Sequence, residues 1–339
     1  MNPILDTDSY KPSHIFQMDP SITGSFFYIS ARGGLYPKTM FGGLQYILME
    51  QISKGFTAED IDEAAELFKA HGEPFNQDAF RRILKVHNGH WPVLMRAVRE
   101  GSLVTTGNVL VTIQSTDPLC AWVPSYIETQ LMRVWYPSTV ATRSAYLKMN
   151  VRRYMEKTCD NLDFLSSRVH DFGSRGVSSR ESAALGGAAH LFNFSGTDTV
   201  PALILARKYY NEPMAGFSIP AAEHFTVTGW GRDNELEAYR HALATLGGQG
   251  RVFAFVCDSY DVYHAVDHLW GCRLREDVEN SGSLVVLRPD SGVPHFMVLK
   301  TLELLASRFG TTLNSKGYKV LKNVRVIHGD SINDQSVDM

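Results

Sequence analysis

The second half of the chain repeats one pattern of hydrophobic and polar positions. From about residue 165 onward, a short apolar run ends in polar or Gly-rich residues and is followed by positions with helical spacing. Strands that alternate with helices in this way predict parallel strands joined by right-handed crossovers. The residues after each run are then expected at the carboxyl ends of the strands, where α/β barrels and open α/β sheets carry their active sites. The pattern occurs six times, in the runs 167–176, 190–198, 214–220, 251–261, 283–292 and 323–334.

The first 160 residues mix helical and strand-like patterns without this alternation. Residues 58–72 predict a helix, because their apolar positions have helical spacing, acidic residues occupy the first turn and a glycine ends the stretch. Residues 102–118 predict two short strands on either side of a Gly-Asn pair. Residues 122–155 predict two helices that are broken near Pro137. This half is therefore expected to be an α+β domain.

Composition and charge narrow the classes of protein. The chain has 339 residues, and the 44% that are hydrophobic suffice for packed cores. A formal charge of −3 without blocks of like charge is not typical of a protein that binds nucleic acid or a membrane surface. The four cysteines are too sparse for a disulfide framework, and the sequence shows no signal-like N-terminus and no run of 18 apolar residues. We expect a cytoplasmic protein with free thiols, in which any phosphate binding is local.

The residues at the predicted strand ends have the chemistry of a phosphate site. Taken singly, an Asp after a strand is more often the N-cap of the next helix, and both Asp198 and Asp258 precede predicted helices. Glycines that expose backbone N–H groups, together with arginines and spare acids on consecutive units, instead favour a phosphorylated sugar bound with a metal ion. The strand-end residues are His170, Asp171, Phe172, Arg175, Asp198, Ser218, Glu223, His224, Asp258, Asp261, Arg288, Asp290, Gly329 and Asp330.

Other classes of enzyme match the sequence less well. A GxxxxGK[ST] loop and a GxGxxG loop after a strand are both absent, which argues against P-loop kinases and Rossmann dehydrogenases. His264 and His268 have the spacing of zinc ligands, but without a third ligand they indicate a helix surface. A haloacid-dehalogenase-like phosphohydrolase is an alternative, because "ILDTDSY" (4–10) and "VIHGDSIND" (326–334) resemble its Asp-based loops. Against it, Tyr10 stands where Thr or Val is usual.

Ten segments in order resemble the nicotinamide phosphoribosyltransferase family of type II phosphoribosyltransferases, among them "HDFGSRGVSS" (170–179), "SIPAAEHFTVTGWG" (218–231) and "LRPDSG" (287–292). The resemblance spans nearly the whole chain. It implies an irregular parallel α/β barrel over residues 161–339 with an N-terminal α+β domain over residues 1–160. The family is a homodimer with shared active sites, and it joins nicotinamide to 5-phosphoribosyl 1-pyrophosphate with Mg²⁺ in NAD salvage. A nicotinate phosphoribosyltransferase of the same superfamily is the second candidate.

The resemblance also assigns roles to residues of this sequence. Phe172 is expected to stack on one face of nicotinamide and Tyr10 of the second subunit on the other. Asp198 is expected to accept the amide N–H, so that it repels the carboxylate of nicotinate. Arg175, Ser218, Arg288, Asp290, Gly329 and Asp330 are expected to bind the ribose and phosphate groups. The catalytic residues implied are His224, Asp258 and Asp290, with Asp258 placed to assist Mg²⁺ and pyrophosphate.

His224 and the end of the chain raise separate expectations. The pyridine nitrogen is the nucleophile, so the reaction needs no general base, and the resemblance implies instead that His224 accepts a phosphate from ATP. Ser174 stands where vertebrate members have an aromatic residue, which indicates a bacterial or phage type. The family continues beyond the "HGD" segment (328–330) with a further Gly-rich phosphate loop. We therefore expect weak or no turnover from the 339-residue chain alone.

Overall fold

The computed structural model describes residues 2–338, which form two compact units. Unit 1 contains residues 1–148 and 166–217, and unit 2 contains residues 149–165 and 218–339. This division differs from the domain boundary predicted at residue 160, because residues 166–217 pack with the first unit. Ala188, Ala202 and Leu205 from this segment belong to the same hydrophobic core as the N-terminal residues. A separate core fills unit 2.

The N-terminal part of unit 1 contains two antiparallel sheets. The strands are β1 (Phe26–Ser30), β2 (Lys38–Met40), β3 (Val93–Ala97), β4 (Leu103–Thr105) and β5 (Val109–Ser115). One sheet has the order β1-β5-β3, and the other pairs β2 with β4. The two strands predicted in residues 102–118 are confirmed as β4 and β5, although they belong to different sheets. Alternate residues of the larger sheet, such as Ile29, Val111 and Ile113, are buried against the helices.

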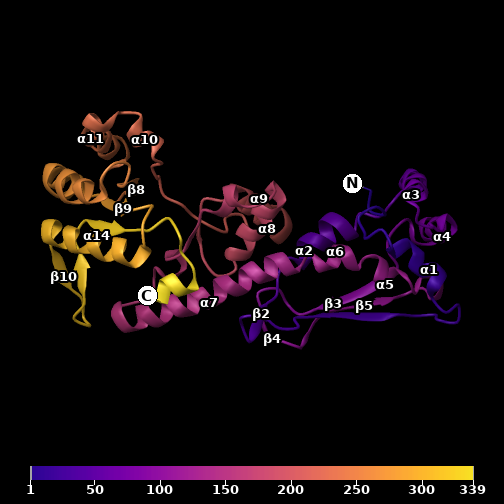
Figure 1. Ribbon diagram of the computed structural model, residues 1–339. Coiled ribbons are helices and arrows are strands. Elements are labelled where there is room, and N and C mark those ends of the chain that lie inside the picture. The colour runs from indigo at the N-terminus through magenta and orange to yellow at the C-terminus, as the bar shows by residue number, and fades with distance from the viewer. Residues whose placement is uncertain (1, 339) are drawn as a thin grey trace. The chain divides into compact units, whose positions relative to one another are not determined.

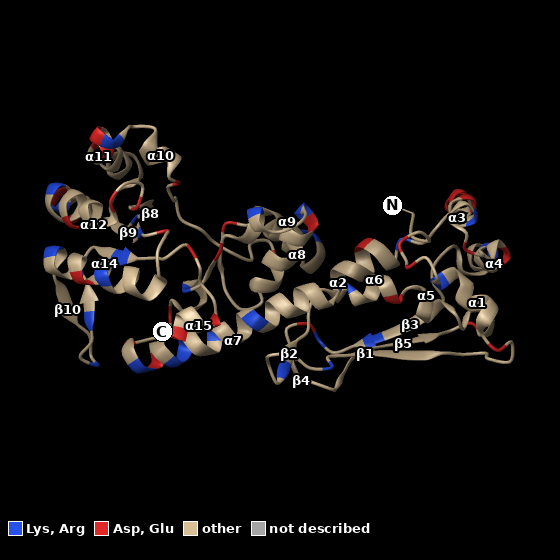
Figure 2. Ribbon diagram, in the orientation of Figure 1, with Lys and Arg blue, Asp and Glu red and all other residues tan. Residues whose placement is uncertain are grey.

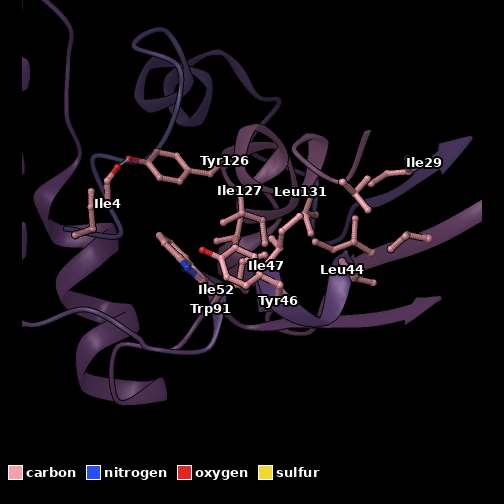
Figure 3. Packing of buried hydrophobic residues seen from close by; sticks show 14 of the residues in the cluster. Ile4, Ile29, Leu44, Tyr46, Ile47, Ile52, Trp91, Tyr126, Ile127 and Leu131 are labelled. Atoms are coloured by element: carbon pink, nitrogen blue, oxygen red, sulfur yellow. Dashed lines mark hydrogen bonds between the residues drawn. The ribbon is translucent and has the colours of Figure 1, made fainter. Parts of the chain in front are cut away.

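Short and medium helices cover the buried face of this sheet. Among them, α3 matches the helix predicted over residues 58–72, with a capping box between Thr57 and Asp60 and a left-handed Gly72 at its end. Figure 3 shows the core, in which the Tyr126 hydroxyl donates a hydrogen bond to the carbonyl of Ile4 (2.6 Å). The helices are α1 (His14–Gln17), α2 (Leu44–Ile47), α3 (Ala58–His71), α4 (Gln77–His87), α5 (Val123–Tyr126) and α6 (Glu128–Met132).

Helix α7 (Trp135–Thr158) is the longest in the chain. The break predicted near Pro137 occurs just before it, at residues 133–134, and Pro137 itself lies in the first turn of α7. A proline is tolerated there because the first N–H groups of a helix have no intrahelical acceptor.

Five of the six predicted strands are present, divided between the two units of the fold. In unit 1, β6 (His170–Asp171) pairs in parallel with β7 (Gly196–Thr197), and α8 (Arg180–His190) and α9 (Val200–Tyr210) follow them. The third strand is reduced to isolated parallel bridges, Gly196 to Phe217 in unit 1 and Ala221 to Ala254 in unit 2.

Unit 2 is built on a parallel sheet with the order β12-β9-β8 (Figure 1). Its strands β8 (Val252–Val256), β9 (Leu284–Arg288) and β12 (Val324–Val326) supply buried residues such as Phe253, Val285 and Val324. The mixed α/β class is confirmed, and closure into an irregular barrel stays a prediction. The other elements are α10 (Phe225–Thr228), α11 (Glu235–Leu246), α12 (Val262–His264), α13 (Arg275–Ser281), α14 (Pro294–Phe309), β10 (Thr311–Leu313), β11 (Lys319–Leu321) and α15 (Asp334–Asp338).

Charged residues of both signs are interspersed along the helices of each unit (Figure 2). This distribution fits the small net charge of −3. None of the helices in residues 2–338 is long and apolar enough to cross a membrane. The four cysteines are free thiols, as predicted, with Cys120 and Cys257 buried.

Candidate functional site

The strand-end residues form two groups, one in each unit. In unit 1, the group is built by β6 and β7, whose parallel register places His170 beside Gly196 and Asp171 beside Thr197. His170 Nε2 lies 2.9 Å from Asp198 Oδ1, and the imidazole ring packs against Phe172 with the centroids 4.8 Å apart. The N-cap of α9 is Thr199. Asp198 is therefore paired with a histidine rather than placed at the N-cap position.

Asp171 holds the turn after β6 in place. Its Oδ1 accepts a hydrogen bond from the backbone N–H of Gly173 (2.8 Å), and its Oδ2 accepts one from Thr197 Oγ1 (3.2 Å). The turn that follows, Gly173–Gly176, contains the exposed Arg175, three positions after Phe172. An exposed arginine in a short Gly-rich turn is suited to contact a phosphate through its guanidinium group.

Tyr10 and Ser218, two further residues predicted to bind substrate, are both exposed. Tyr10 is exposed, and its ring contacts His14 at the start of α1 (5.4 Å between centroids). Figure 1 shows α1 at the opposite end of unit 1 from α8 and α9. Ser218 is exposed in unit 2, where its hydroxyl lies 3.3 Å from the carbonyl of Ile219.

In unit 2, Asp258 is the centre of the second group. It follows β8, and its side chain is only 6% exposed. Oδ1 lies 3.1 Å from His224 Nε2, while Oδ2 accepts hydrogen bonds from the backbone N–H of Asp290 (3.0 Å) and from Ser291 Oγ (2.6 Å). Burial raises the pKa of Asp258, but these hydrogen bonds outweigh burial and hold the pKa below its ordinary value. The N-cap of α12 is Asp261, so Asp258 does not cap that helix.

Arg288, at the end of β9, is held in place by hydrogen bonding through one guanidinium nitrogen, while a second nitrogen has no acceptor among the described residues. Its Nη2 donates to the carbonyl of Ala222 (2.9 Å) and lies 3.6 Å from Asp290 Oδ2. Its Nε is buried and has no hydrogen-bond partner within residues 2–338. A buried guanidinium N–H without a partner is costly, and a phosphate or pyrophosphate oxygen would satisfy it.

The residues after β12 pack directly on this arginine and acid. A Cβ at Gly329 would overlap Asp290 Oδ1, so only glycine lets the two loops come this close. His328 links the same loops, with Nδ1 2.9 Å from the carbonyl of Asp330 and Nε2 3.4 Å from the carbonyl of Ser291. Asp330 is exposed beside them.

The sequence does not predict a role for Ser291 or for His170, which it places only at the end of a strand. One sequence feature could have indicated both, since each is a polar residue next to an Asp at the end of a parallel strand. What the sequence does not give is the partner. The structure pairs His170 with Asp198 and Ser291 with Asp258.

The alternatives find no support in the geometry. Asp6, the first acid of the phosphohydrolase-like "DTD", is bound through both oxygens by the guanidinium of Arg133. Asp8 accepts a hydrogen bond from Thr129. These acids are therefore engaged in contacts within unit 1 and are poorly suited to hold a metal ion or attack a phosphate.

No cluster of three metal-ligand side chains includes His264 or His268 within residues 2–338. His87, Asp117 and Cys120 do form such a cluster. Arg82 Nη1 lies within it, 2.6 Å from Asp117 Oδ2 and 3.5 Å from Cys120 Sγ. A cation bound there would have to displace the guanidinium, so the cluster is explained by the ion pair.

The sequence of this chain matches known protein families and individual proteins. Residues 167–338 match the nicotinate phosphoribosyltransferase (NAPRTase) family, and residues 2–95 match the nicotinamide phosphoribosyltransferase N-terminal domain. The nicotinamide phosphoribosyltransferase of Xanthomonas campestris pv. campestris (strain 8004) is 54% identical over 337 residues, which cover 99% of this chain and 72% of that protein. The enzyme of the same name from Acinetobacter baylyi is 29% identical over 376 residues, covering 100% of this chain and 74% of that protein.

A solved structure shares the fold. The crystal structure of human nicotinic acid phosphoribosyltransferase superposes with a TM-score of 0.57 at 16% identity, over 98% of this chain and 69% of that chain. At this level of identity the likeness concerns the fold alone.

Proposed function

The chain belongs to the family of nicotinate and nicotinamide phosphoribosyltransferases, and we propose that it transfers phosphoribosyl from 5-phosphoribosyl 1-pyrophosphate to nicotinamide. The products are nicotinamide mononucleotide and pyrophosphate, in NAD salvage. The single observation that best supports this is the group around Arg288. A buried guanidinium with an unpaired Nε, an acid 3.6 Å away and a glycine packed on that acid together suit a ribose phosphate.

The base is bound by the group in unit 1. Phe172 supplies an aromatic face, and Asp198 supplies a carboxylate that accepts the amide N–H of nicotinamide. Nicotinate would present a carboxylate to Asp198 with no proton between them, which disfavours it. Tyr10, an exposed ring beside α1, is proposed to stack on the second face of the base from another copy of the chain. The enzyme is therefore proposed to be a homodimer.

The pyridine nitrogen attacks the anomeric carbon of the ribose as the bond to pyrophosphate breaks. Positive charge develops on the ribose ring, and the carboxylates of Asp290 and Asp330 stabilise it electrostatically. Arg288 and Arg175 stabilise the negative charge on the phosphate groups. No side chain acts as a nucleophile toward the sugar, and no general base is required.

Magnesium fits the carboxylates of unit 2, because it prefers oxygen ligands. Both oxygens of Asp258 already accept hydrogen bonds, so Asp290 and Asp330 are the better candidates to hold it with the pyrophosphate. When bound, Mg²⁺ would neutralise charge on the leaving group. Asp258 is proposed to orient His224 and not to bind the metal ion itself.

His224 is proposed to accept a phosphate from ATP. A carboxylate at Asp258 accepts a hydrogen bond from Nε2–H, which leaves the lone pair on Nδ1. Nδ1 then attacks the terminal phosphorus of ATP and releases ADP. His224 is 48% exposed, so this nitrogen can be reached. We also place the protein in the cytoplasm, which the free thiols support.

Mass analysis of the products tests the proposal. The chain is incubated with nicotinamide, 5-phosphoribosyl 1-pyrophosphate and Mg²⁺, with and without ATP, and in parallel with nicotinate. Because we expect only weak turnover from this chain, the expected result is a small amount of nicotinamide mononucleotide, increased by ATP, and less product from nicotinate. Nicotinate turnover above nicotinamide turnover would overturn the role of Asp198, and release of inorganic phosphate from sugar phosphates without a base would favour a phosphohydrolase.

A further inference from the structure

We infer that His170 is a positioning residue for base specificity, because it orients the carboxylate of Asp198 toward the amide of nicotinamide. The inference rests on the proposed function of Asp198 and goes beyond it. His170 Nε2 lies 2.9 Å from Asp198 Oδ1, and the two residues are 28 positions apart in the sequence. The histidine side chain is 14% exposed and that of Asp198 is 39% exposed. The less exposed member of the pair is therefore the histidine.

The imidazole ring of His170 has two close neighbours. Phe172 packs on it with the ring planes at 36° and the centroids 4.8 Å apart. Gly196 lies close to Nδ1 of the ring, because a Cβ there would come within 2.7 Å of this atom. Gly196 therefore leaves the space that the ring occupies, and any side chain there would push the ring from its place.

The backbone fixes both partners at the ends of paired strands. His170 lies in β6 opposite Gly196 in β7, and Asp198 follows β7 directly. The N–H of Asp198 donates to the carbonyl of Asp171 (2.9 Å). The position of the carboxyl group relative to the imidazole is thus set by main-chain contacts, and the hydrogen bond with the histidine restrains the rotation of the carboxylate.

That rotation matters for an amide ligand. The terminal torsion of an aspartate is broad, so a carboxylate without a fixed contact samples many orientations. A donor on Oδ1 selects one plane, and an amide N–H gains most from an acceptor already held in place. An imidazole can donate this hydrogen bond without adding a positive charge. Asp198 then keeps the negative charge that disfavours nicotinate.

Equilibrium binding of the two bases tests the inference on the full chain. Dissociation constants for nicotinamide and nicotinate are measured by calorimetry at pH 8.5 for the wild type, His170→Leu, His170→Gln and Asp198→Asn. The exposed His71→Leu in helix α3 serves as a matched control. Circular dichroism and thermal unfolding establish that each variant is folded.

We expect His170→Leu to weaken nicotinamide binding about tenfold, which corresponds to about 1.4 kcal/mol, and to change nicotinate binding less than twofold. His170→Gln retains an N–H donor of similar reach and should restore nicotinamide binding to within about threefold of the wild type. A parallel loss for both bases, no loss in His170→Leu, or a His170→Gln variant as weak as His170→Leu would each overturn the inference.

The Asp198→Asn variant separates the two levels of the argument. If it leaves the preference between the bases unchanged, or if the wild type binds neither base, the proposed function of Asp198 fails. If Asp198→Asn changes the preference and His170→Leu does not, the role of Asp198 stands and only the inference about His170 is wrong.

Discussion

At the residue scale, the hydrogen bonds of Asp258 determine which imidazole nitrogen of His224 carries a proton. Oδ2 is occupied by Ser291 Oγ and the N–H of Asp290, so Oδ1 is left for His224 Nε2. Because these donors lower the pKa of Asp258, the group is a carboxylate at neutral pH and its partner nitrogen must carry the proton. In the proposed reaction with ATP, this arrangement leaves Nδ1 as the nitrogen of His224 that would attack.

A His224→Ala variant should therefore lose the response to ATP but not the reaction itself. We expect nicotinamide mononucleotide synthesis without ATP to remain detectable, because His224 does not act on the sugar, and the stimulation by ATP to disappear. Product is measured by mass analysis with and without ATP. His268→Ala, an exposed histidine of the same unit, is the control. If His224→Ala is still stimulated by ATP as the wild type is, the histidine has a structural role.

A methyl group at Gly329 should damage the site more than the fold. The Cβ of Gly329→Ala would overlap Asp290 Oδ1 and push this acid away from Arg288. We expect kcat/KM to fall at least tenfold, equivalent to about 1.4 kcal/mol of transition-state stabilisation. Gly24→Ala is a matched control, because the atom nearest to its Cβ is Ser115 Oγ at 4.0 Å. Equal activity of the two variants would contradict the packing described for the strand ends.

At the scale of elements, Asp carboxylates link helices to other segments of the same unit. Asp117 precedes the 3₁₀ turn Pro118–Cys120 and binds helix α4 through His87 Nε2 (2.7 Å) and Arg82 Nη1 (2.6 Å). Burial raises the pKa of Asp117, but these hydrogen bonds outweigh it and hold the pKa at about 2. A similar link in unit 2 joins Arg308 of α14 to Asp267 by two hydrogen bonds of 2.7 Å.

The lowered pKa of Asp117 predicts how stability depends on pH. The unfolded chain takes up a proton at this residue near pH 4, whereas the folded chain resists protonation until about pH 2. The contribution of Asp117 is thus present above pH 4 and is lost as the pH falls from about 4 to about 2. We expect Asp117→Asn to be less stable than the wild type at pH 7, with the difference shrinking toward pH 2.

Urea midpoints measured between pH 7 and pH 2 test this expectation. Asp62→Asn is the control, because Asp62 forms an exposed ion pair with Arg81 (3.2 Å) in the same pair of helices. A difference between wild type and Asp117→Asn that stays constant over the whole range would show that Asp117 acts through packing and not through its charge.

At the scale of the whole molecule, two separate cores support the two groups of strand-end residues. The residues proposed to bind the base lie in unit 1, and those proposed to bind ribose and phosphates lie mainly in unit 2. Tyr10 lies in unit 1, where its ring contacts His14 of α1. Its proposed action on the base of another copy makes the dimer a functional requirement.

Mixing two inactive variants tests whether copies share sites. Tyr10→Ala and Phe172→Ala each remove one ring from every site of their own homodimer, so each alone should be weakly active. After the two are mixed and allowed to exchange subunits, half of the dimers are mixed and carry one intact site of two, so activity should recover to about a quarter of the wild type. A mixture of each variant with itself is the control. No recovery, despite exchange shown by native mass spectrometry, would place both rings in the same chain's site.

Several features follow from the sequence because they are set locally. Helix α3 and its capping box depend on residues 57–72 alone, and the order of the strand-then-helix units depends on hydrophobic spacing within each unit. The identity of the strand-end residues, such as Asp258 and Arg288, is likewise set by position along the chain. The mixed α/β fold could therefore be predicted before any contact was known, and the family was indicated separately by the resemblance of ten segments of the sequence.

The tertiary structure alone decided which of these residues meet. His170 pairs with Asp198 across 28 positions, and Asp258 pairs with His224 across 34 and with Ser291 across 33. Strand order and packing determine such pairs, and so do the close approach of Gly329 to Asp290 and the place of residues 166–217 in unit 1. These contacts are not local, so hydrophobic spacing carries no information about them. The sequence by itself determined the helices, the strands and the residue types at the strand ends. The packing of those elements determined which of these side chains form hydrogen bonds with each other.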